Sequence, residues 1–173
     1  MKILRVALAA AAVLALLPDM ALAEAQAKWT RFQPSDGGYR IEFPGTPTVK
    51  RDTLPSRVGP APHLEANLSS GGLLYSVELT TYASASDPEA VLDLFASGFI
   101  KQGKVLAQKQ LKVGPDLGRR LEIEMEVKDG QAVVTMLVVT DGTRVYHVSC
   151  ISVKGSEHSA NVEHFISSFT LLQ

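Results

Sequence analysis

The segment AVVTMLVV, residues 132–139, is apolar at seven of its eight positions. Asp-Gly pairs stand close to both of its ends, at 129–130 and 141–142, and this dipeptide favours the tight turns of β-hairpins. The pattern predicts a strand that pairs with antiparallel neighbours, residues 119–127 and 143–153. Because both faces of this central strand are apolar, the sheet needs one covering layer above it and another below it.

Two-residue loops would set the register of both hairpins. In the first hairpin they predict pairs that place Leu121 opposite Val138, Ile123 opposite Met136 and Met125 opposite Val134. The opposite face then carries Glu122, Glu124 and Glu126 beside Leu137, Thr135 and Val133. In the second hairpin the same three central residues are expected to meet Tyr146, Val148 and Cys150.

Two amphipathic helices are expected to supply the covering layers. The first is predicted over residues 87–102, because Asp87 suits the N-cap, Pro88 suits the first helical position and Gly103 suits the end. The second is predicted over residues 157–168, where apolar side chains recur at helical spacing. The predicted fold class is therefore α+β, a three-layer α/β/α sandwich around a predominantly antiparallel sheet.

Further short strands are predicted on both sides of the first helix. Their alternating patterns cover residues 29–32, 39–43, 48–54, 63–70, 73–82, 104–113 and 169–172. The Pro-rich stretch 55–62 is expected to be a loop. The corner GGYRIEFPGTP, residues 37–47, lacks the Gly-Lys-Ser/Thr ending of a phosphate loop, so Pro44 and Gly45 are expected to form a type II turn.

The N-terminus has the three parts of a secretory signal peptide. Lys2 and Arg5 precede an apolar run of about twelve residues, too short to cross a bilayer, and small residues follow. Cleavage is expected after Ala23, with later frames ending at Ala25 and Ala27 as alternatives. Residues 1–23 are then the signal peptide, and residues 24–173 form a single domain that is periplasmic or secreted, without membrane insertion after cleavage.

The charge balance and the cysteine content limit the partners and the source of stability. Cleavage would remove two of 17 basic residues and one of 18 acidic residues, leaving a net charge near −2. Such a chain offers no electrostatic attraction for nucleic acid, so no nucleic-acid partner is predicted. Cys150 is the only cysteine, which excludes an internal disulfide, and its strand position predicts a buried structural thiol.

Four stretches of the sequence resemble secreted bacterial proteins of the PsbP-like fold, a family named for an extrinsic subunit of photosystem II. These stretches are FQPSDGGYRIEFPGTP, GPDLGRRLEIEME, DGTRVYHV and FISSFTLL, and they span nearly the whole domain. They consist of turns, strand ends and aromatic anchors. The resemblance implies a fold that commonly serves as a non-enzymatic binding or assembly module, and it supplies no ligand-binding motif that can be matched residue by residue.

The sequence contains several residues of types that can act in catalysis or metal binding. Glu122, Glu124 and Glu126 alternate along one strand at roughly 6.5 Å, which favours a solvated or cross-strand-paired stripe over an acid/base pair. His147 is expected opposite Met136 as a half-buried, hydrogen-bonded side chain rather than a general base. His158 and His164 lack the i, i+4 spacing of a helical zinc pair.

Other single residues also have ordinary structural explanations. His63 stands alone at the start of a strand, and four lysines are expected to mark a solvated edge: Lys101, Lys104, Lys109 and Lys112. The sequence therefore predicts no catalytic residue, no cofactor-binding residue, no cofactor and no metal ligand.

The function expected by elimination is that of a non-catalytic binding or accessory module. Its partner is expected to be another envelope protein or a small ligand. Recognition is expected to use the segment PSRVGPAPH, residues 55–63, through Arg57, Val58 and His63, because prolines limit the entropy lost on binding. Two alternatives stay open: a small-ligand carrier with an apolar cavity between sheet and helix, and a hydrolase whose site is assembled from scattered residues such as His147 and the glutamate stripe.

Overall fold

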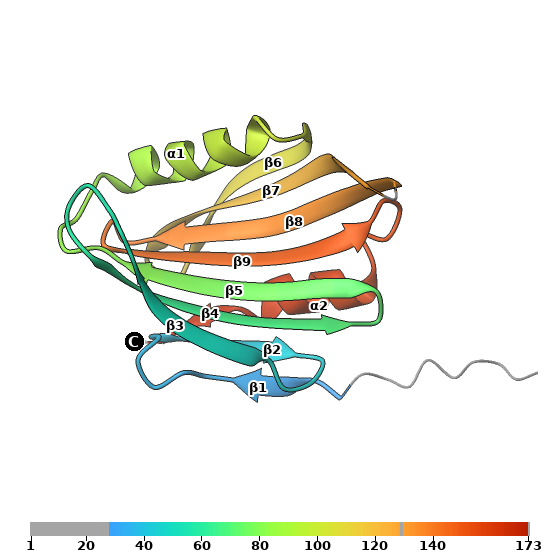
Figure 1. The fold of residues 1–173 in the computed structure, drawn as a ribbon, viewed down its shortest axis with the longest axis horizontal. Helices are drawn as coiled ribbons and strands as arrows, with labels where there is room; N and C mark the ends of the chain where they lie inside the picture. The colour runs from blue at the N-terminus through green and yellow to red at the C-terminus, as the bar shows by residue number, and fades with distance from the viewer. Residues whose placement is uncertain (1–27, 129, 173) are drawn as a thin grey trace, which may run out of the picture.

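A computed structural model describes residues 28–128 and 130–172 (Figure 1). The predicted signal peptide, its cleavage site and the first residues of the predicted domain lie outside this range. Among the described residues, no helix is both long enough and apolar enough to span a membrane.

Seven antiparallel strands form the main sheet, and three short strands form a second one. The main sheet has the order β3 (Thr48–Leu54), β4 (Ala61–Ser70), β5 (Leu73–Thr81), β9 (Arg144–Val153), β8 (Gly130–Thr140), β7 (Asp116–Val127) and β6 (Lys104–Val113). The second sheet has the order β1 (Thr30–Phe32), β2 (Tyr39–Phe43) and β10 (Thr170–Leu171). Helix α1 spans Pro88–Ile100, and α2 spans Ala160–Ser168.

The central strand β8 is buried on both faces, as its sequence predicts. Residues 132–140 are all buried. Val134, Met136 and Val138 belong to one apolar cluster that includes Leu92 and Ala96 of α1. Leu137 and Val139 belong to another cluster, which includes Val162 and Phe165 of α2. Because side chains alternate along a strand, the two helices pack against opposite faces of the main sheet.

The small sheet lies on the same side as α2, which the sequence did not indicate. Tyr39, Ile41 and Phe43 of β2 are fully buried in the cluster that contains Phe165. The rings of Phe43 and Phe165 pack edge to face with their centroids 5.1 Å apart. The side of the main sheet opposite α1 is therefore covered by a helix and a three-stranded sheet together (Figure 1).

Both hairpin registers differ from the prediction by two residues. The first hairpin closes at Val127 and Gly130, so Ile123 pairs with Val134. The second closes at Thr140 and Val145, because the Asp141 carboxylate accepts hydrogen bonds from the backbone N–H groups of residues 143 and 144 and holds a longer loop. A slip of two keeps every side chain on its face, so each face of the strands keeps its predicted members.

Several predicted boundaries also shift. Helix α1 has the expected cap, since Ala90 N–H donates to the Asp87 carboxylate at 3.0 Å, but it ends at Ile100. Helix α2 begins three residues later than predicted, because the Glu157 carboxylate accepts from Gly155 N–H and belongs to the preceding turn. Strand β4 already includes residues 61 and 62 of the predicted Pro-rich loop.

The Pro44-Gly45 corner is not a type II turn. Gly45 has φ of +153°, whereas the third residue of that turn has φ near about +80°. The corner joins β2 of the small sheet to β3 at the edge of the main sheet.

The aromatic contact between α2 and β2 gives a first prediction. Phe165→Ala is expected to lower the free energy of unfolding by about 3–5 kcal/mol, because it removes a fully buried ring from the core. Urea denaturation followed by circular dichroism measures the change. Leu94→Ala, at a helical position that is 71% exposed, is the control and should stay within about 0.5 kcal/mol. Equal losses in the two variants would contradict the packing described.

The single cysteine gives a second prediction. Cys150 is fully buried, and burial raises the pKa of its thiol to about 12. A thiol that is both covered and protonated reacts slowly, so a thiol reagent should label the native protein on the order of 100-fold more slowly than the denatured protein. Labelling at equal rates would show that the thiol is accessible in the native state.

Candidate functional site

Two polar clusters gather on opposite sides of the main sheet. The α1-side cluster consists of His63, Glu78 and His147. The α2-side cluster consists of Arg120, Glu122, His158 and Glu163. Each cluster combines residues that the sequence singled out with residues that it did not.

The α1-side cluster lies where the part of the sheet that α1 leaves uncovered meets the edge of α1. Helix α1 packs against β7 and β8, whereas β3, β4 and β5 lie in front in Figure 1 without a helix over them. On this face the neighbouring strands carry polar side chains, in contrast to the apolar face beneath α2. They include Asp52, His63, Glu65, Asn67, Ser76, Glu78, Thr80 and His147.

Glu78 joins the two histidines of the cluster. Its carboxylate oxygens lie 3.9 Å from His63 Nε2 and 3.5 Å from His147 Nδ1. His63 Nδ1 lies 3.0 Å from the Thr80 hydroxyl. Contact with His147 lowers the pKa of Glu78, although burial opposes that effect. The side chains of His63 and His147 are only 9% and 12% exposed, so the cluster forms a recessed, partly dry surface.

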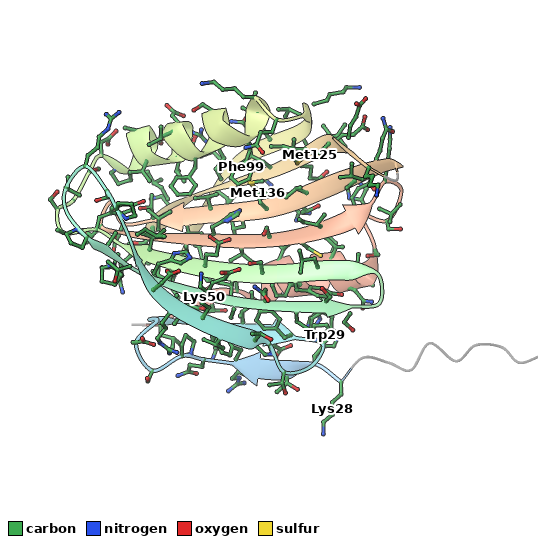
Figure 2. The ribbon with its side chains drawn as sticks, in the orientation of Figure 1. Lys28, Trp29, Lys50, Phe99, Met125 and Met136 are labelled. Carbon is green, nitrogen blue, oxygen red and sulfur yellow. The ribbon has the colours of Figure 1, made fainter. Side chains whose placement is uncertain are left out.

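One polar atom of the α1-side cluster has no partner among the described residues. His147 Nε2 is buried and forms no hydrogen bond there, and the His147 ring lies 5.3 Å from the ring of Phe99 on α1. Figure 2 shows Phe99 between α1 and the sheet. Buried polar atoms are normally satisfied, so this nitrogen, enclosed beside Phe99, is an exception among the described residues.

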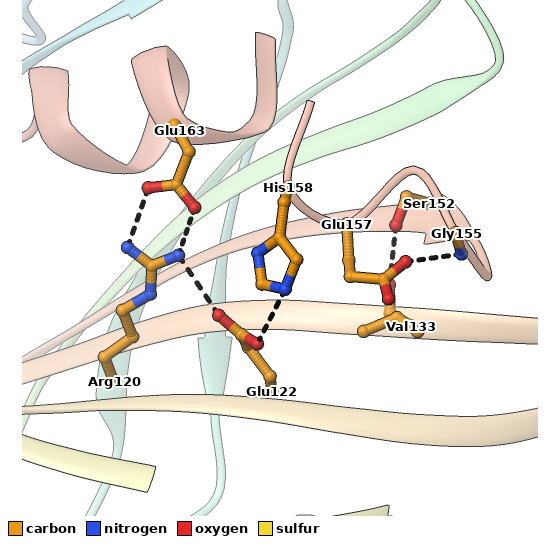
Figure 3. A network of polar contacts seen from close by, with 8 residues as sticks. All are labelled: Arg120, Glu122, Val133, Ser152, Gly155, Glu157, His158 and Glu163. Atoms are coloured by element: carbon orange, nitrogen blue, oxygen red, sulfur yellow. Dashed lines mark hydrogen bonds and ion pairs between the residues drawn. The ribbon is translucent and has the colours of Figure 1, made fainter. Parts of the chain in front are cut away.

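The α2-side cluster is held together by one arginine (Figure 3). Arg120 Nη1 donates to Glu163 Oε2 at 2.9 Å, and Arg120 Nη2 donates to Glu163 Oε1 at 2.5 Å. The same Nη2 donates to Glu122 Oε1 at 3.2 Å, and His158 Nε2 lies 3.8 Å from Glu122 Oε2. These contacts tie α2 and the segment before it to strand β7.

The α2-side cluster also contains a set of donors that could coordinate a metal ion. One donor atom from each of Glu122, His158 and Glu163 lies within 4.8 Å of the others. However, the Arg120 guanidinium already lies against both carboxylates, so a metal ion would have to displace it. The hydrogen bonds from Arg120 lower the pKa of Glu163, and those to Glu163 raise the pKa of Arg120. The geometry is that of an ion-pair clamp.

The glutamate stripe is only partly the solvated or paired surface that the sequence predicts. Glu124 pairs with Lys154 at 2.6 Å, and Glu126 is exposed. Glu122 is paired as well, but it is 8% exposed and therefore buried, which corrects the expectation of solvent contact. It is buried because the segment before α2 lies over β7, a contact between residues far apart in sequence (Figure 3).

The structure also shows where the histidines singled out by the sequence lie. His147 is partly buried as expected, but it lies opposite Val138 rather than Met136, in line with the shifted register. His158 lies before α2, while His164 lies on α2 and contacts Glu42 at 2.8 Å, so the structure does not bring these two histidines together. Of the predicted lysine edge, Lys104, Lys109 and Lys112 are exposed on β6 at the edge of the main sheet, whereas Lys101 is the C-cap of α1.

Sequence reasoning missed Glu78, Arg120 and Glu163. The signal for Glu78 was present, because the apolar alternation of residues 73–79 leaves Ser76, Glu78 and Thr80 together on the other face. No comparable signal existed for the contact between Arg120 and Glu163, which lie 43 residues apart.

Comparison with known proteins supports the fold. No family model matches the sequence, and no curated protein matches it. The solution structure of cyanobacterial PsbP (CyanoP) from Synechocystis sp. PCC 6803 matches with a TM-score of 0.57 and 14% identity, over 84% of this chain and 93% of that chain. The crystal structure of LpqN, involved in cell envelope biogenesis of Mycobacterium tuberculosis, matches with a TM-score of 0.47 and 12% identity, over 84% of this chain and 91% of that chain.

A Pseudomonas aeruginosa protein of unknown function matches with a TM-score of 0.43 and 11% identity, over 75% of this chain and 85% of that chain. The likeness to cyanobacterial PsbP confirms the PsbP-like fold expected from the sequence. Residues 28–128 and 130–172 thus form a mostly antiparallel PsbP-like fold with two helices.

The ion-pair clamp gives a third prediction. Contact with Arg120 holds the folded-state pKa of Glu163 below its unfolded value of about 4.3. The clamp therefore stabilises the fold fully at pH values above the unfolded pKa. This stabilisation is lost as pH falls through the folded-state pKa. Urea denaturation between about pH 6 and about pH 3 should therefore show a larger loss of stability for the wild type than for Glu163→Gln.

The control for the clamp is Glu126→Gln, which removes an exposed carboxylate from the strand that also carries Glu122. Its pH dependence should match that of the wild type. If Glu163→Gln also matches the wild type at every pH, the clamp contributes nothing to stability.

Proposed function

We propose that this protein is a non-catalytic binding or accessory module that recognises its partner through the uncovered half of the sheet beside α1. The observation that carries the proposal is the α1-side cluster, in which two recessed histidines share Glu78, whose side chain is 34% exposed. A partner that reaches this surface can donate hydrogen bonds to the Glu78 carboxylate.

The placement of the cluster on strands favours recognition. His63, Glu78 and His147 lie on three neighbouring strands of the seven-stranded sheet, so their backbones are already ordered. Binding therefore loses little conformational entropy.

The loop proposed from the sequence belongs to the same end of the surface. Residues 55–60 connect β3 to β4, and Arg57 and Val58 are exposed on this connection. The Ser56 hydroxyl donates to the Gly59 carbonyl at 2.6 Å, which closes the loop. His63 lies in β4 rather than in the loop, so the recognition residues suggested by the sequence divide between the loop and the α1-side cluster.

The remaining parts of the proposal concern location, layers and partner. The signal-peptide pattern of residues 1–23 supports export to the periplasm or beyond, where the partner would be another envelope protein or a small ligand. We also interpret the fold as a three-layer α/β/α sandwich, in which the small sheet shares the layer of α2. This interpretation rests on the packing of the helices against opposite faces.

The alternative of a small-ligand carrier has weaker support. A hollow of about 930 Å³ lies between the β4–β5 turn and the ends of β7, β8 and β9, and its lining includes Leu74, Ile151 and Val153. It lies beyond the helices, at one end of the sheet, whereas a carrier was expected to hold its ligand between sheet and helix.

A capture experiment with matched variants tests the proposal, and this is the fourth prediction. Tagged protein, exported in its native host, is crosslinked and recovered, and the captured partner is quantified by mass spectrometry. Glu78→Gln removes the charge that the two histidines share and should reduce the affinity of the purified partner at least about tenfold, or about 1.4 kcal/mol. An Arg57→Ala/Val58→Ala variant tests the loop separately.

Glu126→Gln is the control, since it alters an exposed glutamate on β7, away from the uncovered strands. It should capture as well as the wild type, and all variants should keep the melting temperature of the wild type within a few degrees. If Glu78→Gln captures the partner as well as the wild type does, the partner does not bind at this surface. If His147→Ala abolishes a measurable turnover, the protein is an enzyme and the proposal fails.

A further inference from the structure

A polar hollow lies far from the α1-side cluster, where the outer surface of the small sheet meets the C-terminal half of α2. Its volume is about 270 Å³. Strands β1, β2 and β10 and helix α2 all contribute to its wall. The side chains that matter here are Arg31, Arg40, Glu42, His164, Ser167 and Thr170.

Two arginines in this hollow lack partners. Among residues 28–128 and 130–172, neither Arg31 nor Arg40 forms an ion pair or a side-chain hydrogen bond. Elsewhere in the described chain, arginines that lie beside carboxylates are paired with them. These are Arg51, Arg119, Arg120 and Arg144. Arg31 and Arg40, both exposed, therefore contribute guanidinium groups without protein partners to the lining of one hollow.

The one carboxylate in the hollow is already engaged. Glu42 Oε2 lies 2.8 Å from His164 Nε2, and the Glu42 backbone N–H donates to the Ser168 hydroxyl at 3.0 Å. With a neutral imidazole the hollow carries two positive charges against one negative charge. The C-terminal end of α2 opposes an anion, so the attraction has to come from the two arginines.

We propose that this hollow binds a phosphate-type oxyanion. A guanidinium presents two parallel N–H donors that match two oxygens of such a group, and two arginines can hold it from two sides. The hydroxyls of Ser167 and Thr170 now donate to backbone carbonyls at 3.2 and 3.4 Å, which are long contacts that can be exchanged for a ligand oxygen. This site is independent of the proposed partner surface.

The protein carries its own reporter for this hollow. Trp29 is the only tryptophan in the chain, and its ring centroid lies 4.1 Å from that of His164. Figure 2 shows Trp29 beside the small sheet, close to the start of the described chain. A ligand that moves His164 or alters its charge changes the surroundings of the indole and hence its fluorescence.

Titration with inorganic phosphate at constant ionic strength tests the proposal and is the fifth prediction. Trp29 fluorescence should change as phosphate is added and should reach a plateau. If the fluorescence does not change, ³¹P line broadening should report binding. Arg31→Gln and Arg40→Gln should each weaken the apparent affinity at least about tenfold. Arg57→Gln, which removes an exposed arginine from the β3–β4 loop, is the matched control and should bind as the wild type does.

A vesicle arm distinguishes a free oxyanion from a lipid headgroup. Vesicles of phosphatidylglycerol are compared with vesicles of phosphatidylcholine alone, using the same four proteins. Phosphate binding that is lost in the arginine variants supports a free ion as ligand, and binding confined to phosphatidylglycerol and lost in the same variants supports a headgroup. The proposal is overturned if neither probe binds, or if the Arg31→Gln and Arg40→Gln proteins bind as the wild type does. Partner capture through Glu78 is unaffected by either result.

Discussion

The burial of β8 on both faces is the constraint on which the rest of the structure depends. Its alternate side chains reach two separate apolar clusters, one beneath α1 and one beneath α2 and the small sheet. An antiparallel strand with only one covered face would leave valines and leucines in water, at a cost of roughly 1.5–3 kcal/mol for each side chain. The positions of both helices follow from that requirement.

The two covers are unequal, and this inequality creates the polar surfaces. Helix α1 covers β7 and β8 but leaves β3, β4 and β5 open. Because no helix covers that face of these strands, it can carry polar side chains such as His63 and Glu78. On the other side α2 is too short to cover the sheet alone. The small sheet fills the remaining area, and the Arg120–Glu163 clamp ties the helix to β7.

Electrostatic pairing separates the polar sites from one another. In the α2-side cluster an arginine satisfies both carboxylates, so the donor set that could have bound a metal is already occupied. In the α1-side cluster Glu78 is shared by two imidazoles and one ring nitrogen is left over. In the hollow beside α2 the balance is reversed, because the carboxylate is engaged and the arginines are not. Three sites of similar composition thus have different chemical capacities.

The sequence by itself determined the elements and their faces, because alternation, Asp-Gly turns and the Asp87 cap are local signals. Its resemblance to PsbP-like proteins indicated the fold. Even the wrong hairpin registers kept the correct faces, since a slip of two preserves strand alternation. Only the tertiary structure decided that Glu122 is buried, that Glu78 lies between His63 and His147, and that Arg31 and Arg40 share a hollow. These contacts join residues distant in sequence, and their distances depend on sheet order and packing, which no local pattern encodes.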